Sequence, residues 1–411
     1  MNRREFVGHM AAGAAVFAAY PSARALGANN RIRIGLIGAG DRGMHDLKEA
    51  VRQPDVECVA VADLYSGRRD EAKKLYPGVE VYDDHRRLLE RKDIDAVIVA
   101  TSLNQHALCM LDALSAGKDV YCEKTMTYDI PEAVACRKAA QSSKQVVQIG
   151  LQHESDGDLA DARKWVQDGI VGKVTMVESW MSRNTRHGHG QWVRPIPSDC
   201  NPQHVNWDLF LYGRPKSTFD ANKFINWRLF WEFSGGNVTE NMVHQIAWIM
   251  TALDLKEPLA ATMAGGVFSE KDGREVPDTI AVTLEYPETV ILWQSSFNNS
   301  HFGLGERILG TDGTIEHISG ATDMVTGKYA SGINYFPEKM NRPDGTNITG
   351  QTPGRDHMAN WMECIRSRNQ KTNAPMEIGY NSAVAAHMAN MAYRQKRRIT
   401  LDEALSAKPV F

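Results

Sequence analysis

Short apolar runs alternate with amphipathic stretches from residue 31 to about residue 150. The apolar runs read IRIGLIG, VECVAVAD, DAVIVAT, DVYCEK and QVVQIG, and stretches with helical spacing lie near 43–53, 66–76, 84–91, 104–116 and 130–142. Continuous Val/Ile runs are typical of parallel strands buried on both faces, and the intervening helices can cover those faces. The pattern therefore predicts an α/β, doubly wound parallel sheet in the first part of the chain.

After residue 150 the pattern becomes that of an α+β domain. A helix near 158–168 precedes an alternating strand over 173–182, and a long helix over 236–253 precedes strand-like runs over 259–268, 278–286, 289–297 and 306–319. Alternation with turn residues between the runs predicts an open, mostly antiparallel sheet. We expect a loop over 335–355 and helices over 355–368 and 381–395. This organisation gives a first domain over 29–152, a second over 153–395 and a C-terminal tail over 396–411.

Residues 183–227 fit neither pattern, because they are rich in Pro, Asn, His and Trp and have weak periodicity. A stretch this long without regular structure is more often a functional lid than filler. Side chains in and beside it combine aromatic faces with N–H donors, which suit a sugar: Trp180, Arg183, Trp192, Arg228 and Trp231. We treat these as candidate substrate contacts.

The N-terminus has the pattern of an export signal. Arg3 and Arg4 form a charged region, Met10 to Tyr20 is a short apolar run, and Ala23 and Ala25 frame a small-x-small cleavage site. The paired arginines resemble the twin-arginine signal, which directs export of folded proteins. The apolar run is about half the length that spans a bilayer, so no stable membrane anchor is expected. We predict a signal over 1–28, recognition by the twin-arginine export machinery, and a periplasmic or otherwise exported protein.

Composition and charge do not indicate a nucleic-acid partner. Hydrophobic residues make up 43% of the chain and charged residues 24%, as in ordinary globular proteins, and the net charge is −3. This charge gives no argument for nucleic acid as a partner. The six cysteines have no CxxC spacing and lie mostly in predicted strands and helices, so we expect buried free thiols rather than disulfides.

The first predicted strand leads directly into a glycine motif, GLIGAGDRG. Gly38, Gly40 and Gly43 have G-x-G-x-x-G spacing, and Asp63 ends the second strand twenty residues beyond Gly43. This is the Rossmann dinucleotide-binding pattern, in which glycines let a pyrophosphate approach a helix N-terminus and the acid binds a ribose. The carboxylate of Asp63 would repel a 2′-phosphate, so NAD is favoured over NADP. Arg68 and Arg69 fall on the following helix and are expected to be solvated.

Two short motifs carry candidate proton-transfer chemistry. Glu123 and Lys124 end the fifth parallel strand, at the sheet edge where ligands bind. Glu240 and His244 are four residues apart on one predicted helix and so face the same way. A histidine or a lysine of lowered pKa can remove the proton of an alcohol hydroxyl while hydride leaves the carbon. Alone, the Glu123–Lys124 motif is equally compatible with a surface ion pair. A lone histidine such as His244 on an apolar helix is more often a core residue.

The order of these motifs resembles the Gfo/Idh/MocA family, named for glucose–fructose oxidoreductase and inositol dehydrogenase. The likeness covers roughly residues 31–400 and includes ATSLNQH and the ending NWMECIRSR…AYRQKRRI. The resemblance implies catalytic roles for Lys124, Glu240 and His244, and oxidation or reduction of a secondary alcohol on a sugar or polyol ring with bound NAD(P). It also implies that the open sheet often forms an oligomer interface, so we expect a homo-dimer or homo-tetramer.

The resemblance and the glycine motif together define a predicted cofactor-binding set: Gly38, Gly40, Asp41, Arg42, Gly43, Asp63, Thr101, Asn104, His106, Glu123, Lys124 and Gln152. The chain departs from the family pattern at several places. Thr125 replaces the usual proline, Glu240 stands where aspartate is common, Ala247 replaces a frequent second aspartate, and GLQHESD lacks the arginine often found after the sixth strand. These departures concern substrate selectivity rather than the redox residues.

A metal site is a further alternative. His187, His189 and His204 could supply ligands from the long irregular segment, but no carboxylate or cysteine stands at a fixed spacing from them. We therefore predict no metal.

Three functions remain open on the sequence. The first is an exported oxidoreductase acting on a sugar, polyol or glycoside through tightly bound NAD. The second is a redox-neutral NAD-dependent glycosidase, in which oxidation, elimination, hydration and re-reduction leave NAD unchanged. The third is a non-catalytic sugar-binding homologue. Because free NAD is scarce outside the cell, an exported enzyme must regenerate its cofactor in the site, by a second sugar-like substrate or by a redox-neutral cycle.

Overall fold

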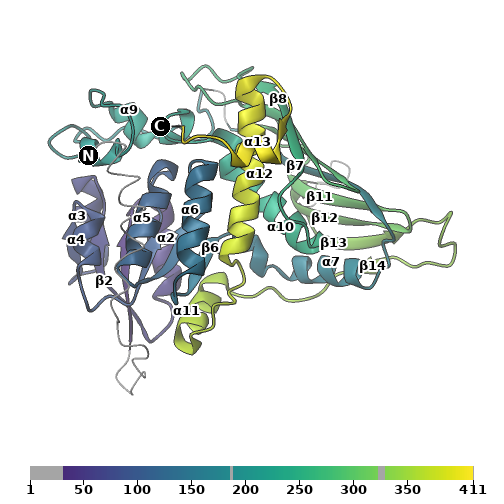
Figure 1. Ribbon diagram of the computed structural model, residues 1–411, viewed down its shortest axis with the longest axis horizontal. Coiled ribbons are helices and arrows are strands. Elements are labelled where there is room, and N and C mark those ends of the chain that lie inside the picture. The colour runs from purple at the N-terminus through teal and green to yellow at the C-terminus, as the bar shows by residue number, and fades with distance from the viewer. Residues whose placement is uncertain (1–30, 186–187, 323–328, 411) are drawn as a thin grey trace.

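The first domain is a six-stranded parallel sheet with helices on both faces (Figure 1). This computed structural model describes residues 31–185, 188–322 and 329–410, so the predicted signal over 1–28 lies outside the described residues. The strands are β1 Ile32–Ile37, β2 Val56–Ala62, β3 Glu80–Tyr82, β4 Ala96–Val99, β5 Asp119–Glu123 and β6 Val147–Gly150, in the order β3-β2-β1-β4-β5-β6. The helices between them are α2 Asp41–Ala50, α3 Ser66–Leu75, α4 His85–Leu89, α5 Leu103–Ser115 and α6 Ile130–Gln141. The doubly wound prediction is confirmed.

Local chemistry explains where these elements begin. β4, β5 and β6 are buried at every position, which their continuous apolar runs require. Asp129 caps α6 by accepting a hydrogen bond from the Glu132 N–H, and Pro131 stands at the helix start, where its missing N–H costs nothing. The strands up to β3 are added on one side of β1, and those from β4 onward on its other side. This change of order between β1 and β4 creates the crevice where ligands bind in such sheets.

The second domain is built on a nine-stranded sheet, β14-β13-β12-β11-β7-β10-β9-β8-β15. Its strands are β7 Val174–Ser182, β8 Ala260–Gly266, β9 Thr279–Glu285, β10 Val290–Ser296, β11 Leu304–Gly310, β12 Gly313–Thr322, β13 Tyr329–Pro337, β14 Ile348–Thr349 and β15 Ile399–Thr400. All neighbours pair antiparallel except β7 and β10. The expected open, mostly antiparallel sheet is therefore confirmed.

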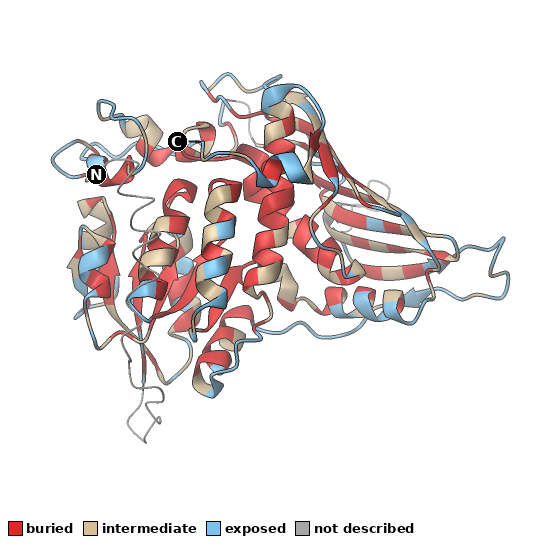
Figure 2. Cartoon of the chain, in the orientation of Figure 1, coloured by how far each residue is buried: buried red, intermediate tan, exposed pale blue. Residues whose placement is uncertain are grey.

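Helices α7 Gly157–Gln167, α10 Val243–Leu253 and α12 Met376–Gln395 lie beside this sheet, and the buried side chains gather between them and the strands (Figures 1 and 2). α10 carries Gln245, whose amide donates to the Glu306 carboxylate of β11, while the Trp293 indole of β10 donates back to Gln245. These hydrogen bonds hold α10 against β10 and β11 near the middle of the sheet. They therefore fix the position of the residues at the start of that helix.

The C-terminal part of the chain differs from the sequence prediction. α11 His357–Ser367 returns to the first domain, where Trp361 is fully buried in one cluster with β1 residues such as Ile34. The expected tail over 396–411 is partly structured, because β15 pairs with β8 and α13 Leu401–Leu405 begins with a Thr400–Glu403 capping box. Residues 335–355 contain the end of β13 and the short β14. These pairings depend on distant partners, which local periodicity does not reveal.

The long irregular segment lies across the first domain. Among its described residues the helical elements before residue 230 are α8 Trp207–Phe210, α9 Ala221–Ile225 and the 3-10 turn η2 Trp227–Leu229. Its aromatic side chains share a buried cluster with Tyr65, Leu103 and Tyr128 of the first domain. We call residues 188–233 the cap. Backbone hydrogen bonds from Ser66 N–H to the His204 carbonyl, and from Asn206 N–H to the Leu64 carbonyl, tie the cap to the loop after β2.

Candidate active site

The glycine turn after β1 is shaped for a close approach by a ligand. Gly38 has φ +96°, and a Cβ there would lie 2.6 Å from the Ala100 carbonyl oxygen. A Cβ at Gly43 would lie 1.9 Å from the Gly38 carbonyl oxygen, so this glycine is required for the turn itself. At Gly40, by contrast, the nearest atom to an added Cβ is the Arg68 guanidinium carbon at 3.8 Å. The space in front of Gly40 is open.

The same turn begins α2, and no side chain caps the helix N-terminus at Gly40. Uncapped N–H groups at a helix start attract anions, and the open space beside Gly40 admits one. The turn therefore fits the pyrophosphate of a dinucleotide.

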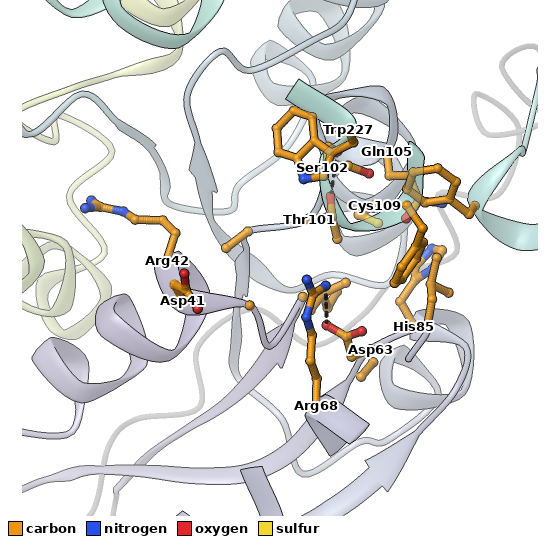
Figure 3. A pocket seen from close by; sticks show the side chains of 18 of the residues that line it. Asp41, Arg42, Asp63, Arg68, His85, Thr101, Ser102, Gln105, Cys109 and Trp227 are labelled. Carbon is orange, nitrogen blue, oxygen red and sulfur yellow. Dashed lines mark hydrogen bonds and ion pairs between the residues drawn. The ribbon is translucent and has the colours of Figure 1, made fainter. Parts of the chain in front are cut away.

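Asp63 lies at the end of β2, beside this turn. One carboxylate oxygen accepts the Ala39 N–H at 2.7 Å, and the other accepts the Tyr65 N–H at 2.9 Å. Arg68 lies 3.8 Å from the same carboxylate, and the Arg69 guanidinium donates to the Asp63 backbone carbonyl at 2.7 Å. Figure 3 shows Arg68 turned toward Asp63. The expectation that both arginines are solvated is wrong, because this carboxylate and carbonyl draw them inward.

A cavity that is open to solvent extends between the turn and the cap. Of the predicted cofactor-binding residues, the cavity is lined by Gly38, Gly40, Asp41, Arg42, Asp63 and Thr101. The cap contributes Arg194, Phe210, Phe224, Trp227 and Arg228. Arg194 also lies 2.9 Å from Asp41 of α2, so an ion pair joins the cap to the helix that begins at the glycine turn. Of these five cavity-lining residues, the sequence analysis names only Arg228, since no local motif marks the other four.

Other predicted cofactor residues support the walls of this site. The Asn104 amide donates to the Phe210 carbonyl of the cap at 2.9 Å. His106 is buried, with its ring nitrogens 2.7 Å from the Thr125 carbonyl oxygen and 3.1 Å from the Thr101 carbonyl oxygen, and burial lowers its pKa. Glu123 accepts hydrogen bonds from Arg42 at 2.9 Å and from Gln152 at 2.8 Å. These contacts fix the loops after β4 and β5.

Lys124 and Glu240 meet where the two domains join. The Lys124 ammonium donates to the Glu240 backbone carbonyl at 2.8 Å and lies 3.4 Å from its carboxylate. Arg228 of the cap donates to the same carboxylate at 2.9 Å. Burial alone would raise the pKa of the Glu240 carboxyl, but the charges of Lys124 and Arg228 bring it below its ordinary value. Glu240 is therefore an ionised carboxylate that holds two cations at the site.

Glu240 belongs to a π-helical turn, η3 Val238–Met242, that runs directly into α10. Such turns are rare and often occur at functional sites, because the wider turn redirects side chains that a regular helix would stack. The sequence spacing correctly predicts that Glu240 and His244 lie on one helical segment, but the π-turn between them is not visible in the sequence.

His244 is half-buried at the start of α10, and its Nδ1 is shielded from solvent without a hydrogen-bond partner. Burial, followed by the charge of Lys124, lowers its pKa well below the ordinary value, so the imidazole is neutral at physiological pH. A neutral imidazole beside a lysine can accept a proton from a hydroxyl group. An orphaned buried nitrogen is also what a bound polar ligand would satisfy.

The structure brings only some of the candidate substrate residues to this site. Arg183 follows β7, and its charge contributes to the lowered pKa of His244. Trp180 alternates to the other face of the sheet, where its indole donates to the Phe302 carbonyl and its ring contacts Arg307. Trp231 stacks on Tyr393 and lines a separate cavity, although Arg228, three residues earlier, lies at the site.

The two described histidines that were considered for a metal, His189 and His204, have different surroundings. His187 lies outside the described residues, His189 is exposed, and the His204 ring lies 2.8 Å from the Ser66 hydroxyl. Within residues 31–185, 188–322 and 329–410, no group of three His, Cys, Asp or Glu side chains could hold a metal ion. Within the same ranges no helix is long and apolar enough to cross a membrane.

Comparison with known proteins agrees with this arrangement. Residues 32–151 match the family model of the Gfo/Idh/MocA oxidoreductase NAD-binding Rossmann fold, and residues 212–401 match that of the family's C-terminal alpha/beta domain. A glycosyl hydrolase family 109 protein from Stenotrophomonas maltophilia is 28% identical over 76% of this chain and 73% of its own length. An inositol 2-dehydrogenase from Rhizobium meliloti is 32% identical, but over 36% of this chain and 44% of its own length.

Solved structures share the fold at low identity. The WlbA dehydrogenase from Bordetella pertussis, in complex with NADH and UDP-GlcNAcA, has a TM-score of 0.66 at 18% identity and covers 90% of this chain and 99% of its own. An aldose-aldose oxidoreductase from Caulobacter crescentus has a TM-score of 0.66 at 17% identity, over 90% of this chain and all of its own. Both show that the two-domain architecture is a shared one.

Proposed function

Because the chain belongs to the Gfo/Idh/MocA family of NAD-binding oxidoreductases, we propose that it oxidises or reduces a secondary hydroxyl of a sugar or polyol. The observation that carries the proposal is the neutral His244, with a shielded and unpaired Nδ1, beside Lys124, which Glu240 holds at the carboxyl end of β5. The inositol dehydrogenase relatives support a polyol or sugar ring as the substrate class.

The residues have separable roles in this proposal. A nicotinamide cofactor supplies the hydride acceptor or donor. Lys124 and His244 hold and move the hydroxyl proton, and the ionised Glu240 orients Lys124 and Arg228 by direct contact. The glycine turn and the start of α2 bind the pyrophosphate, and Asp63 binds a ribose hydroxyl. Asp63 favours NAD over NADP, although Arg68 beside it weakens the repulsion of a 2′-phosphate.

The cap supports tight retention of the cofactor. Five of its side chains line the cavity, and it is joined to the first domain by the Arg194–Asp41 ion pair and the buried aromatic cluster. A dinucleotide under this cap would leave only after these contacts open. Retention agrees with the twin-arginine pattern at Arg3 and Arg4, since an enzyme exported in its folded state could carry its cofactor along. The open face of the second sheet is the surface through which we expect a homo-dimer or homo-tetramer.

A redox-neutral glycosidase is the second candidate. The family 109 glycosyl hydrolase is the observation in its favour, because its similarity extends over both domains rather than over the Rossmann domain alone. The same Lys124 and His244 would serve transient oxidation of a sugar hydroxyl, and the later re-reduction would leave the nicotinamide unchanged.

One set of assays separates these functions. The mature protein is purified without added cofactor, its near-ultraviolet absorbance is recorded for bound nicotinamide, and free sugars, polyols and chromogenic glycosides are then offered. Reduction of the bound nicotinamide by a free sugar or polyol, stalling after one turnover, is the expected result. Release of a glycoside's aglycone without net reduction would instead establish the glycosidase, and a protein with bound cofactor but no reaction would be a sugar-binding homologue.

A further inference from the structure

His153 lies against the candidate base, on an element that the proposed mechanism does not use. It belongs to the 3-10 turn η1 Gln152–Ser155, directly after β6. Its ring meets that of His244 edge to face, with centroids 5.5 Å apart and an interplanar angle of 84°. The contact joins the end of the first sheet to the start of α10 and limits how far the His244 ring can turn.

A carboxylate anchors His153 on its other side. His153 Nδ1 lies 2.6 Å from a carboxylate oxygen of Asp156, and both side chains are 42% exposed. Burial disfavours the charged imidazole, but the hydrogen bond to Asp156 and its charge more than offset this and raise the pKa of His153. Glu306 of β11 also favours the charged form, whereas the neighbouring His317 of β12 opposes it. His153 is therefore the member of the pair that takes the proton.

His244 faces cations from four different elements. They are Lys124 at the end of β5, His153 on η1, Arg42 on α2 and Arg183 after β7. Lys124 and Arg42 are each bonded to a buried glutamate, Glu240 and Glu123, which compensates part of their charge. His153 instead touches the His244 ring directly, and its counter-ion is the half-exposed Asp156.

We propose that His153 is a positioning residue for His244: its ring edge fixes the orientation of the base, and its positive charge, anchored by Asp156, adds to burial and to Lys124 in favouring the neutral form of His244. The chemical use of that neutrality rests on the proposed function. The charge relation itself does not, because the protonation of His244 can be measured without turnover.

Three variants separate charge from packing. His153→Phe keeps a planar ring against His244 but removes the charge. Asp156→Asn keeps His153 but removes its counter-ion, so His153 loses its proton at lower pH. His301→Gln is the matched control, because His301 is exposed in the turn before β11 and contacts Phe302.

The test is an NMR pH titration of the purified holoprotein with labelled histidine side chains. The His244 signal is assigned as the one that is absent from the spectrum of His244→Asn. We expect the pKa of His244 to rise by about one unit in His153→Phe, as the loss of a nearby, partly exposed positive charge predicts. Asp156→Asn should lower the pKa of His153 itself, and His301→Gln should leave both histidine titrations in place. An unchanged His244 titration in His153→Phe would overturn the proposal, because packing alone would then account for the contact.

Kinetics supply an independent reading where a substrate has been found. In His153→Phe the acid limb of the pH profile of kcat/KM should move to higher pH by the same amount, while the plateau value of kcat/KM at higher pH is largely retained. A purely structural role would lower kcat/KM at every pH without moving the limb, and that result would also contradict the proposal. If no sugar, polyol or glycoside reacts, the proposed function fails, yet the NMR shift would still establish the His153–His244 relation.

Discussion

At the scale of single residues, the site depends on charges that compensate one another. Glu240 is buried, yet it stays ionised because Lys124 and Arg228 both contact it. Removing either cation would leave a buried charge partly unpaired, which is costly. His244 differs, because it is surrounded by cations and is neutral. One ionised carboxylate and one neutral base, a few residues apart on the same segment, divide the work of orientation and proton transfer.

Substitution of the proton-handling residues tests this division. We expect Lys124→Met and His244→Asn each to lower kcat about 10²- to 10⁴-fold, the usual range for loss of a general acid or base. Bound nicotinamide should remain, since neither side chain lines the cavity beside the glycine turn. The measurement is kcat on the best substrate together with cofactor content after denaturation. Lys164→Met, on the exposed side of α7, is the control, and full activity in His244→Asn would refute the assignment.

At the scale of elements, the glycine turn and its helix form one unit in which two glycines have different tasks. A Cβ at Gly43 would strike the backbone of Gly38, whereas a Cβ at Gly40 would enter open space. Gly43 is thus required by the fold, and Gly40 by the ligand. The same G-x-G-x-x-G pattern covers both, so the sequence does not distinguish these roles.

A matched pair of alanine variants tests the distinction. Gly40→Ala should keep the wild-type melting temperature of the cofactor-free protein but weaken dinucleotide binding at least tenfold, because the new methyl group occupies space beside the helix start. Gly43→Ala should lower the melting temperature itself, because the turn must shift. Thermal unfolding with and without added NAD measures both effects. Equal loss of stability in the two variants would contradict the proposed roles.

His317 links β12 to β11 and α7, and it makes the second domain sensitive to alkaline pH. Its ring nitrogens lie 2.6 Å from Glu306 and 3.3 Å from Asp158, and these carboxylates raise its pKa to about 10 against the opposing effect of burial. The folded pKa exceeds the ordinary value of 6.5, so the stabilisation is complete below pH 6.5 and is lost as the pH rises toward about 10.

Chemical denaturation across this pH range gives the corresponding prediction. The free energy of unfolding of the wild-type protein should fall from neutral to alkaline pH more steeply than that of His317→Gln, which lacks the titrating group. The difference between the two slopes is the quantity to compare, because the substitution also lowers stability at every pH by leaving Glu306 without its partner. Parallel curves would show that His317 is not charged in the folded protein.

At the scale of the whole molecule, the cap makes one enclosed site out of two domains. Its aromatic cluster with Tyr65, Leu103 and Tyr128 buries the loops that follow β2 and β4, so the cofactor cavity has walls from both parts of the chain. Asn104 and Gln105 of α5 add hydrogen bonds to the carbonyls of Phe210 and Leu209. The cap residues therefore complete the wall of the cavity that the first domain begins.

Loosening the cap should release the cofactor. We expect a double variant, Asn104→Ala with Gln105→Ala, to speed dissociation of bound nicotinamide by up to about thirtyfold, since each of the two lost hydrogen bonds is worth about 1 kcal/mol. Loss of bound cofactor during dialysis is the measurement. Gln370→Ala, which removes hydrogen bonds to the Ser143 and Gln145 carbonyls away from the cap, is the control. Equal retention in all three proteins would show that the cap does not limit release.

Much of the fold followed from local pattern. The five apolar runs up to residue 150 correspond to β1, β2, β4, β5 and β6, and the second sheet contains each strand expected from alternation. The short β3, β14 and β15 were missed, because two or three residues carry no periodicity and are strands only through their partners. The nine-residue β13 was also missed, and the single run expected over 306–319 is in fact the two strands β11 and β12. The site divides in the same way: Asp63 and Lys124 follow strands and were found, whereas Arg194 and His153 have no motif to mark them.

The sequence by itself determined the two sheets, the glycine turn and the motifs of Lys124, Glu240 and His244, because burial periodicity and turn chemistry act between near neighbours in the chain. Only the tertiary structure decided that Trp180 faces away from the site, that Arg68 turns inward to Asp63, and that the cap covers the cofactor cavity. These outcomes depend on which distant residues share a buried space. Sheet register and the packing of aromatic side chains decide that, and neither is encoded in any short stretch of the chain.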